Sequence, residues 1–428
     1  MAAFLDDDRS SVTRVYLHTF GCKANQYDSE VVRQALEQAG ASVVDDPGLA
    51  DAAVVNSCTV THTGEAKMRG LVRRLARRRP GVRTVVMGCA AAVDDGVIAR
   101  LPGVTGVVRG VDPAAVLAAL ALEPRPGDGI LRRFARGTRA WLKVQDGCDE
   151  HCTFCATVLA RGRNRSRSVA EVLTEARRLA EGVEEIVLTG VHIGSYGGDC
   201  ARPESLGTLL ERLVAEVPRV RFRLSSVEAT ELDECLARLM ADRPDRLAPH
   251  LHAPLQSGSD RVLKRMGRHW YTAAAYRQRV EALAVRLPVF GLGADVIVGF
   301  PGESETDYRA TRALVAALPF TYVHVFPYSE RPGAPARRLG PPVEAARARG
   351  RSAELRALVA DKARRHVATR DRGRADVVLL DRQGGRHEGL TEDFLTVYVP
   401  TDGERPPARY AATLRYTGTD LMAEPHAA

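Results

Sequence analysis

The amino-acid sequence predicts an α/β protein in three parts: an N-terminal doubly wound α/β domain at residues 12–124, a central partial (βα)6 barrel at 134–370, and a small C-terminal β-barrel at 373–428. Two blocks in which apolar runs alternate with amphipathic segments support the first two parts. A stretch bearing Pro and Gly at 123–129 separates these blocks and is typical of a linker. The last part has short β-like runs between turn residues, which favours a barrel or sandwich of strands.

The first block contains four apolar runs that we expect to form buried parallel strands. These runs are residues 15–20, 52–56, 84–88 and 104–108. Segments with helical periodicity lie between them, at 28–39, 63–78 and 94–101. Strands that alternate with helices in this way are typical of a small, doubly wound α/β domain.

Three cysteines follow the first three of these strands: Cys22, Cys58 and Cys89. The carboxyl ends of parallel strands meet at one edge of the sheet, where open α/β domains bind ligands. We therefore expect the three thiols to converge although they are far apart in sequence. The alternative is that each is a small buried apolar side chain. The same placement after three strands favours a shared metal cluster over that alternative.

The second block contains six further candidate strands, at 140–145, 185–189, 221–225, 250–255, 289–299 and 321–328. Six strand–helix units suit a partial barrel better than a closed eightfold one. Barrel enzymes carry their chemistry on the loops that follow the carboxyl ends of the strands. The first of these loops holds the most informative motif of the chain.

This motif places Cys148, Cys152 and Cys155 within eight residues. Thiolates bind both zinc and iron–sulfur clusters. Structural zinc requires a fourth protein ligand, and His151 lies inside the loop, where convergence with its neighbours would be strained. A 4Fe–4S cube held by three cysteines keeps one iron open for a small molecule. The spacing therefore favours a cluster, and the second set of three cysteines also lacks a fourth ligand.

An arginine-rich helical segment at 343–374 precedes the C-terminal strands, and its charges fit a solvated helix face better than a binding surface. The expected strands of the last part are 375–380, 394–399 and 410–416. Another run of arginines, at 161–167, follows the cysteine motif. These arginines could bind phosphate groups, and a merely solvated loop is the alternative.

Composition narrows the functional class. With 45% hydrophobic and 27% charged residues the chain is globular, and no run approaches the length of a membrane span. The N-terminus, with Asp6 to Asp8, does not resemble a secretory signal, so we expect a cytoplasmic protein without a membrane partner. In that reducing compartment the eight cysteines favour metal binding over disulfides. The net charge of +8 favours RNA as a partner, although an arginine-rich proteome would explain it equally well.

The three-cysteine spacing, with aromatic Phe154 before the last cysteine, resembles the radical S-adenosylmethionine superfamily. Further segments resemble its methylthiotransferase family, and they are residues 21–30, 56–61, 88–90, 188–194, 254–259 and 295–303. The C-terminal part is similar to the TRAM module, which binds RNA in that family. The chain departs from the family pattern in having Ala90 to Ala92 where a glutamine is usual, and in lacking a proline at 156–159. Neither departure removes a cysteine.

The resemblance implies two 4Fe–4S clusters and S-adenosylmethionine as cofactors. In the family, the cluster on Cys148, Cys152 and Cys155 cleaves S-adenosylmethionine to a radical that takes a hydrogen from the substrate carbon. The cluster on Cys22, Cys58 and Cys89 would supply the sulfur, and a second S-adenosylmethionine the methyl group. Candidate S-adenosylmethionine contacts are Phe154, Thr189, Gly190, Gln256, Ser257 and Gly299, with turn geometry as the alternative for those at strand ends.

Lys23 and residues 25–27 are most like the MtaB-type branch of the family. Its members add a methylthio group to C2 of N6-threonylcarbamoyladenosine beside the tRNA anticodon. The implied partners are tRNA and an electron donor such as flavodoxin or ferredoxin. Alternatives are the same chemistry on isopentenyladenosine in tRNA or on a ribosomal protein, and a non-catalytic iron–sulfur protein that binds RNA.

Overall fold

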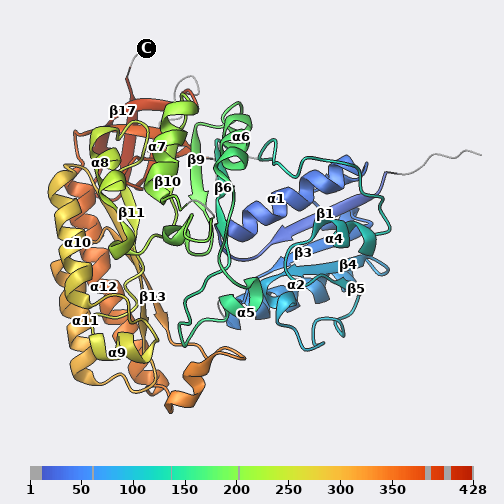
Figure 1. Cartoon of the computed structure of the whole chain (residues 1–428), viewed down its shortest axis with the longest axis horizontal. Coiled ribbons are helices and arrows are strands. Elements are labelled where there is room, and N and C mark those ends of the chain that lie inside the picture. Colours follow the sequence, from blue (N-terminus) through green and yellow to red (C-terminus); the bar gives the residue numbers. More distant parts are fainter. Residues whose placement is uncertain are drawn as a thin grey trace, which may run out of the picture. The chain divides into compact units, whose positions relative to one another are not determined.

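The computed structural model describes residues 12–59, 62–135, 137–200, 203–380, 387–399 and 406–426 (Figure 1). The chain divides into two compact units, of which one ends at Ile130 and the other begins at Leu131. The three domain boundaries expected from the sequence stay a prediction. Within the described ranges no helix combines the length and the apolar character that a bilayer crossing requires.

The first unit is built on a five-stranded parallel sheet with the order β2-β1-β3-β4-β5. Its elements are β1 (Arg14–Thr19), α1 (Lys23–Gln38), β2 (Ser42–Val44), β3 (Ala52–Ser57), α2 (His62–Arg78), β4 (Arg83–Gly88), α3 (Cys89–Ala92), β5 (Val104–Val107) and α4 (Pro113–Ala119). Side chains alternate between the two faces. Val54 and Val85 pack with α1 and α4, and Val55 and Val86 pack with α2. The doubly wound fold is confirmed, and the strand order changes direction between β1 and β3.

The prediction of a helix at residues 94–101 is wrong, because this segment forms turns. The Asp94 carboxylate accepts hydrogen bonds from the backbone N–H groups of Gly96 and Ile98, both at 3.1 Å. Gly96 has a φ of +94°, which a continuous helix does not allow. An aspartate side chain that satisfies these donors competes with the helical hydrogen bonds. The structure also adds β2 and α4, which the sequence did not predict.

The second unit contains six parallel strands in two three-stranded sheets, β10-β9-β6 and β11-β12-β13. They are β6 (Arg139–Lys143), β9 (Glu185–Thr189), β10 (Arg221–Leu224), β11 (His250–His252), β12 (Gly291–Val298) and β13 (Tyr322–Pro327). Isolated parallel bridges, Phe222 with Leu247 and Ser226 with His252, connect the two sheets. The result is the expected partial barrel, in the strand order β6-β9-β10-β11-β12-β13.

Helices follow these strands along the chain (Figure 1). They are α6 (Val169–Leu179), α7 (Leu206–Glu216), α8 (Glu234–Asp242), α9 (Asp260–Arg265), α10 (Ala273–Arg286), α11 (Glu305–Ala317) and α12 (Ala345–Thr369). Several begin with an N-cap side chain that accepts a backbone hydrogen bond, as Ser168 does for α6. α12 packs along β13 and α11 and leads to the C-terminal part.

The C-terminal part is a closed barrel of five strands, β14-β15-β16-β18-β17. They are β14 (Arg374–Leu379), β15 (His387–Leu390), β16 (Thr396–Val399), β17 (Arg409–Tyr416) and β18 (Leu421–Pro425). The expected small β-barrel is thus confirmed. The strand predicted at 394–399 begins only at Thr396, because Phe394 lies in a turn with a φ of +71°. The sequence did not predict β15 and β18.

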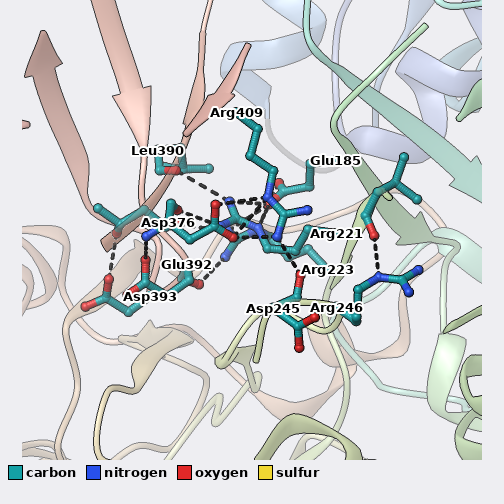
Figure 2. A network of polar contacts seen from close by, with 12 residues as sticks. Glu185, Arg221, Arg223, Asp245, Arg246, Asp376, Leu390, Glu392, Asp393 and Arg409 are labelled. Atoms are coloured by element: carbon teal, nitrogen blue, oxygen red, sulfur yellow. Dashed lines mark hydrogen bonds and ion pairs between the residues drawn. The ribbon is translucent and has the colours of Figure 1, made fainter. Parts of the chain in front are cut away.

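The first residues of the six barrel strands form what we call the barrel floor. They are Arg139, Glu185, Arg221, His250, Gly291 and Tyr322. Figure 2 shows Glu185 among the arginines of this end of the barrel. Its carboxylate pairs with Arg139 at 2.7 Å, Arg221 at 2.8 Å and Arg223 at 2.9 Å. Burial alone would raise the pKa of Glu185, but these three arginines hold it well below its usual range.

The C-terminal barrel covers this floor (Figure 2). Arg221 donates to the carbonyl of Asp376 at 2.6 Å, and Arg223 donates to the carbonyls of Thr391 and Glu392. The turn between β15 and β16 places the Phe394 ring 4.4 Å from the His250 ring, centroid to centroid. A Cβ atom on Gly291 would lie 2.1 Å from the carbonyl oxygen of Asp393, so only glycine allows this approach. The floor is therefore closed by backbone and ring contacts from the C-terminal barrel.

Candidate active site at the barrel rim

We call the opposite end, where the six strands finish, the barrel rim. The cysteine loop leaves it between β7 (Gln145–Asp146) and α5 (Thr157–Arg161), and β7 pairs with β8 (Arg165–Ser166). Gly147 has a φ of +72°, and a Cβ atom there would lie 1.8 Å from the carbonyl oxygen of Arg163. Burial would raise the pKa of Asp146, but Lys143 and Arg161 lower it to about 2. The start of the loop is therefore fixed by a required glycine and by the partly buried ion pairs of Asp146.

The middle of the loop is held at Thr153. Its N–H donates to the carbonyl of Met266 at 2.8 Å, and its carbonyl accepts from the N–H of Ala336 at 2.8 Å. The Thr153 hydroxyl donates to the carbonyl of Arg265 at 2.9 Å. Phe154 packs against the buried apolar cluster formed by Val262, Met266, Phe300 and Ala336. The loop thus keeps its path through backbone hydrogen bonds that do not use the thiols.

Gln145 connects this loop to the segment after β9. The side chain is fully buried, and its Oε1 accepts from the N–H groups of Val191 at 3.0 Å and His192 at 2.9 Å. Its Nε2 donates to the carbonyl of Gly147 at 2.6 Å. A Cβ atom on Gly190 would lie 2.6 Å from the Gln145 carbonyl oxygen. Glycine at 190 therefore lets two rim loops approach closely.

The three thiols of the loop contact different partners. Cys148 Sγ lies 3.8 Å from His192 Nδ1, Cys152 Sγ accepts from Arg268 Nη1 at 3.4 Å, and Cys155 Sγ lies 3.0 Å from the hydroxyl of Thr157. Burial raises the pKa of the Cys152 thiol to about 12, although the Arg268 guanidinium opposes this shift. A metal that binds Cys152 would therefore displace a proton.

Arg268 is the central cation of the rim. It is buried, forms an ion pair with Glu228 after β10, and donates to the hydroxyl of Tyr271 at 3.0 Å. Burial would lower the pKa of His192, but hydrogen bonds with Cys148 and Glu231 raise it to about 10. Within the described ranges, Oε2 of Glu228 and Oε2 of Glu231 are buried without a hydrogen-bond partner. These two oxygens can accept hydrogen bonds from the ammonium and hydroxyl groups of a ligand.

The other residues proposed from the sequence lie at the rim with different local roles. Thr189 is buried at the end of β9 and precedes Gly190. Gln256 has a φ of +60°, and its carbonyl accepts from the N–H of Ile297. The Ser257 hydroxyl lies 3.3 Å from that of Thr311. A Cβ atom on Gly299 would meet that of Ala348 at 2.8 Å. Ser257 and Gly299 thus have packing roles, and a role in binding S-adenosylmethionine stays a prediction for the whole set.

In the first unit, Asn25 of α1 lies among the three other cysteines. Its Oδ1 lies 3.9 Å from Cys22 Sγ and 3.7 Å from Cys89 Sγ. Its Nδ2 donates to the carbonyls of Phe20 and Ser57, both at 2.9 Å. A Cβ atom on Gly21 would lie 3.2 Å from Cys58 Sγ. The structure therefore brings the loops after β1, β3 and β4 together at one sheet edge.

Both sets of cysteines fit an iron–sulfur cluster held by three thiolates. All eight cysteines are free of disulfides. Among the described residues, no three His, Cys, Asp or Glu side chains converge on the ligand positions of a single metal ion. A cubane binds its thiolates at separate iron corners, so its cysteine sulfurs lie farther apart than the ligands of one ion. The thiolate donor type of both sets suits an iron–sulfur cluster.

Two family matches cover the two sets of cysteines. Residues 14–110 match Uncharacterized protein family UPF0004, and residues 142–315 match the Radical SAM superfamily. The threonylcarbamoyladenosine tRNA methylthiotransferase MtaB of Bacillus subtilis is 40% identical over 343 residues, covering 76% of this chain and 75% of that protein. The chain belongs to the radical S-adenosylmethionine methylthiotransferase family. The resemblance recognised from the sequence motifs is thus confirmed.

Other members of this methylthiotransferase family are similar over the same share of the chain. The protein named MtaB from Thermotoga maritima is 38% identical, covering 76% of this chain and 77% of that protein. The tRNA-2-methylthio-N(6)-dimethylallyladenosine synthase of Acidithiobacillus ferrooxidans is 37% identical, with the same coverage. Among solved structures, the radical S-adenosylmethionine methyltransferase TsrM of Kitasatospora setae has a TM-score of 0.56 at 17% identity, covering 76% of this chain and 77% of that one. This last likeness supports the fold alone.

Sequence reasoning missed five polar residues that shape the two cysteine sites: Asn25, Gln145, His192, Glu228 and Arg268. Asn25 and His192 lie inside segments that matched the family motifs, so the signal was present but not assigned to a residue. Gln145 stands at the end of an apolar strand just before the cysteine loop, which is a detectable position. Arg268 lies 116 residues from Cys152 in sequence, and only the fold brings them together.

Proposed function

We propose that this chain adds a methylthio group to C2 of N6-threonylcarbamoyladenosine next to the tRNA anticodon. The observation that carries the proposal is the 40% identity with a relative named for this reaction, over 76% of the chain. The two sets of three cysteines support it, because the radical step and the sulfur transfer each need an iron site. The closed C-terminal barrel, similar to an RNA-binding TRAM module, and the net charge of +8 suit a tRNA substrate.

In this proposal Cys148, Cys152 and Cys155 hold one 4Fe–4S cluster, and Cys22, Cys58 and Cys89 hold a second. When bound at the rim, the first cluster and S-adenosylmethionine would supply the radical chemistry. The chain orients the reactants: Gln145 ties the cysteine loop to the segment after β9, and Thr153 fixes the middle of the loop. The Oε2 atoms of Glu228 and Glu231, which have no hydrogen-bond partner among the described residues, suit the polar groups of S-adenosylmethionine.

A second candidate substrate is dimethylallyladenosine in tRNA, because a relative named for that product is 37% identical over a similar share of the chain. The chemistry at the target carbon would be the same. The two substrates differ in the N6 substituent, which is polar and carries a carboxylate in one and is apolar in the other. Residues that face this substituent therefore decide between the two reactions.

The test is mass spectrometry of nucleosides from the tRNA of the host, with and without this gene. The proposal expects the methylthio form of threonylcarbamoyladenosine to disappear and its unmodified precursor to rise. Loss of the methylthio form of dimethylallyladenosine would move the function to the second candidate. Unchanged tRNA would contradict both, and the search would turn to ribosomal proteins or to a non-catalytic role.

The proposal extends to the cellular setting. Eight cysteines without disulfides suit the reducing cytoplasm, where tRNA is also found. The open cluster requires one electron for each cleavage, so a low-potential protein such as flavodoxin or ferredoxin is the expected donor. The assignment of the second cluster is tested by Cys58→Ala, with Cys200→Ala as the control. Cleavage of S-adenosylmethionine should persist in Cys58→Ala while methylthiolated product is lost, and full product formation would make the N-terminal cysteines structural.

A further inference from the structure

A row of aromatic side chains, which we call the ladder, follows the inner face of β13 from the floor toward the rim. Tyr322, His324 and Phe326 alternate with the buried Val323 and Val325, so these three share the inner face, and Tyr328 follows directly after the strand. The ring centroids of Tyr322 and His324 are 5.4 Å apart, and those of His324 and Phe326 are 6.3 Å apart. The ladder starts at the floor, where Phe394 lies 5.4 Å from Tyr322.

Exposure is greatest in the middle of this series of rings, at His324 and Phe326. Tyr322 is partly buried, whereas His324 and Phe326 are exposed. Phe326 is 38% exposed and is the one phenylalanine among the exposed large apolar side chains of the described ranges. Burying an aromatic ring is strongly favourable, so a ring left open to solvent inside a barrel suggests a surface that a ligand covers.

The neighbouring strand surrounds the exposed rings with polar and apolar groups. In the pairing of β12 with β13, Asp295 lies opposite His324 and Ile297 lies opposite Phe326. The Asp295 carboxylate lies 3.3 Å from His252 Nε2, and the other ring nitrogen of His252 lies 3.1 Å from the Tyr322 hydroxyl. The face therefore combines a flat aromatic surface with hydrogen-bonding groups at one side.

The upper end of the ladder reaches the cysteine loop. Tyr328 packs edge-on against Phe300 at 5.3 Å and belongs to the same apolar cluster as Phe154. A few residues further on, the N–H of Ala336 donates to Thr153 of the loop. Among the described residues, the buried hydroxyl of Tyr328 has no hydrogen-bond partner. A molecule that lies on Phe326 would therefore lie close to the segment that carries Cys152 and Cys155.

We propose that His324 and Phe326 form the platform on which the target adenine stacks, with Asp295 and His252 beside its polar edge. Enzymes that modify a base take it out of the helical stack, and exposed aromatic side chains then replace its lost stacking partners. An adenine has the flat shape that this face accommodates and the hydrogen-bonding edge that the Asp295 side can meet. The inference rests on the proposed function, because it assumes an RNA base as the substrate.

The experiment is a double-mutant cycle between the ring and the base. The full chain, reconstituted with iron and sulfide, is titrated onto a labelled anticodon stem-loop RNA, and binding is followed by fluorescence anisotropy. One RNA has adenosine at the target position and the other has an abasic site there. The variants are Phe326→Ala and Phe326→Tyr, and the control is Val285→Ala on α10, where the side chain is 89% exposed. Thermal unfolding of each variant verifies its fold.

Phe326→Ala should weaken binding of the adenosine RNA on the order of tenfold and leave the abasic RNA within about twofold. Phe326→Tyr should restore binding, and Val285→Ala should change neither RNA. Equal weakening of both RNAs, or no weakening, would overturn the inference. If Phe326→Ala does not fold, His324→Ala takes its place. It should weaken binding of the adenosine RNA selectively as well, but by a smaller factor. If the effect of Phe326→Ala depends on the base but no methylthiolated product forms, the platform is supported and the proposed substrate is rejected. If product forms but the effect does not depend on the base, only the platform is rejected.

Discussion

At the barrel floor one carboxylate, Glu185, meets three arginines, and Glu185, Arg221 and Arg223 are buried. At the barrel rim the three thiols of the cysteine loop contact three different partners, and buried oxygens of Glu228 and Glu231 have no hydrogen-bond partner in the described part of the chain. The carboxylate of the floor thus finds its ion-pair partners within the protein. The rim keeps donors and acceptors for molecules that are not part of the chain.

The same six strands therefore contribute residues that stabilise the fold at the floor and residues available for chemistry at the rim. Each barrel strand contributes its first residue to the floor and its last residue to the rim, only a few residues apart. Barrel enzymes in general place reactive groups at the carboxyl ends of their strands and structural ones at the other end. Substitutions at the two ends should therefore have opposite signatures.

The largest expected effect is at the rim. Cys148→Ala should reduce cleavage of S-adenosylmethionine to background, because the proposed cluster would lose one of its three ligands. The free energy of unfolding of the metal-free chain should change by about 1 kcal/mol or less. The measurement is 5′-deoxyadenosine by liquid chromatography, with Cys235→Ala as the control. Continued 5′-deoxyadenosine formation would refute the assignment of this loop as the radical site.

Glu185→Gln at the floor should instead lower the free energy of unfolding, which is the reverse of the effect at the rim. Three arginines would lose their shared carboxylate, which costs about 3–5 kcal/mol of unfolding free energy. Urea denaturation measures this loss, and the exposed Glu281→Gln should stay within about 0.5 kcal/mol. Because the pKa of Glu185 is lowered by folding, its contribution is complete above the pKa of an unfolded carboxyl and is lost as the pH falls below it. The gap between variant and wild type should therefore persist from pH 7 to pH 5.

A smaller effect is expected at Gln145, which joins two rim loops. Gln145→Ala would leave the N–H groups of Val191 and His192 without their acceptor, at a cost of about 1–3 kcal/mol. Cleavage of S-adenosylmethionine should fall but remain measurable, since no cysteine is changed. The exposed Gln278→Ala provides the comparison. Full wild-type cleavage in Gln145→Ala would mean that the cysteine loop keeps its position without this connection.

The smallest effect concerns the arginines after the cysteine loop. Arg161 pairs with Asp146 and Arg167 with Glu175, so these two have structural roles. Arg163 has a side chain that is 93% exposed and remains a candidate for phosphate contact. Arg163→Gln should weaken tRNA binding slightly and reduce the salt dependence of binding by about one ion. Arg372→Gln, at 92% side-chain exposure, is the matched control, and equal slopes for both variants would favour a merely solvated loop.

Much of this fold follows from local sequence patterns. The strand predicted at 185–189 coincides with β9, because its central Ile186, Val187 and Leu188 supply the apolar side chains that a strand buried on both sides needs. The failure at 94–101 has an equally local cause, since the Asp94 side chain replaces helical hydrogen bonds. β15 and β18 escaped prediction because His387, Glu388 and Glu424 interrupt the apolar pattern of short strands at a barrel surface.

The functional sites also contain residues that local sequence patterns indicate and contacts that they do not. Each cysteine could be recognised from its spacing or from its place after a strand. The contacts of Cys152 with Arg268 and of Arg221 with the carbonyl of Asp376 join residues more than 100 positions apart, and local patterns contain no information on such pairs. One signal was available for the floor: Arg221 and Arg223 are charged positions inside a strand that is otherwise apolar. Such charges need a buried partner, although the sequence does not say which.

The turn that carries Phe394 packs against the floor of the (βα)6 barrel. The C-terminal barrel is therefore a structural part of the larger barrel as well as an appended module. An exchange of this module for a foreign one, by recombination or by design, would remove the ring against His250 and the carbonyl groups that receive Arg221 and Arg223. A viable chimera would have to bring an equivalent turn of its own. The C-terminal barrel and the (βα)6 barrel should therefore be inherited together.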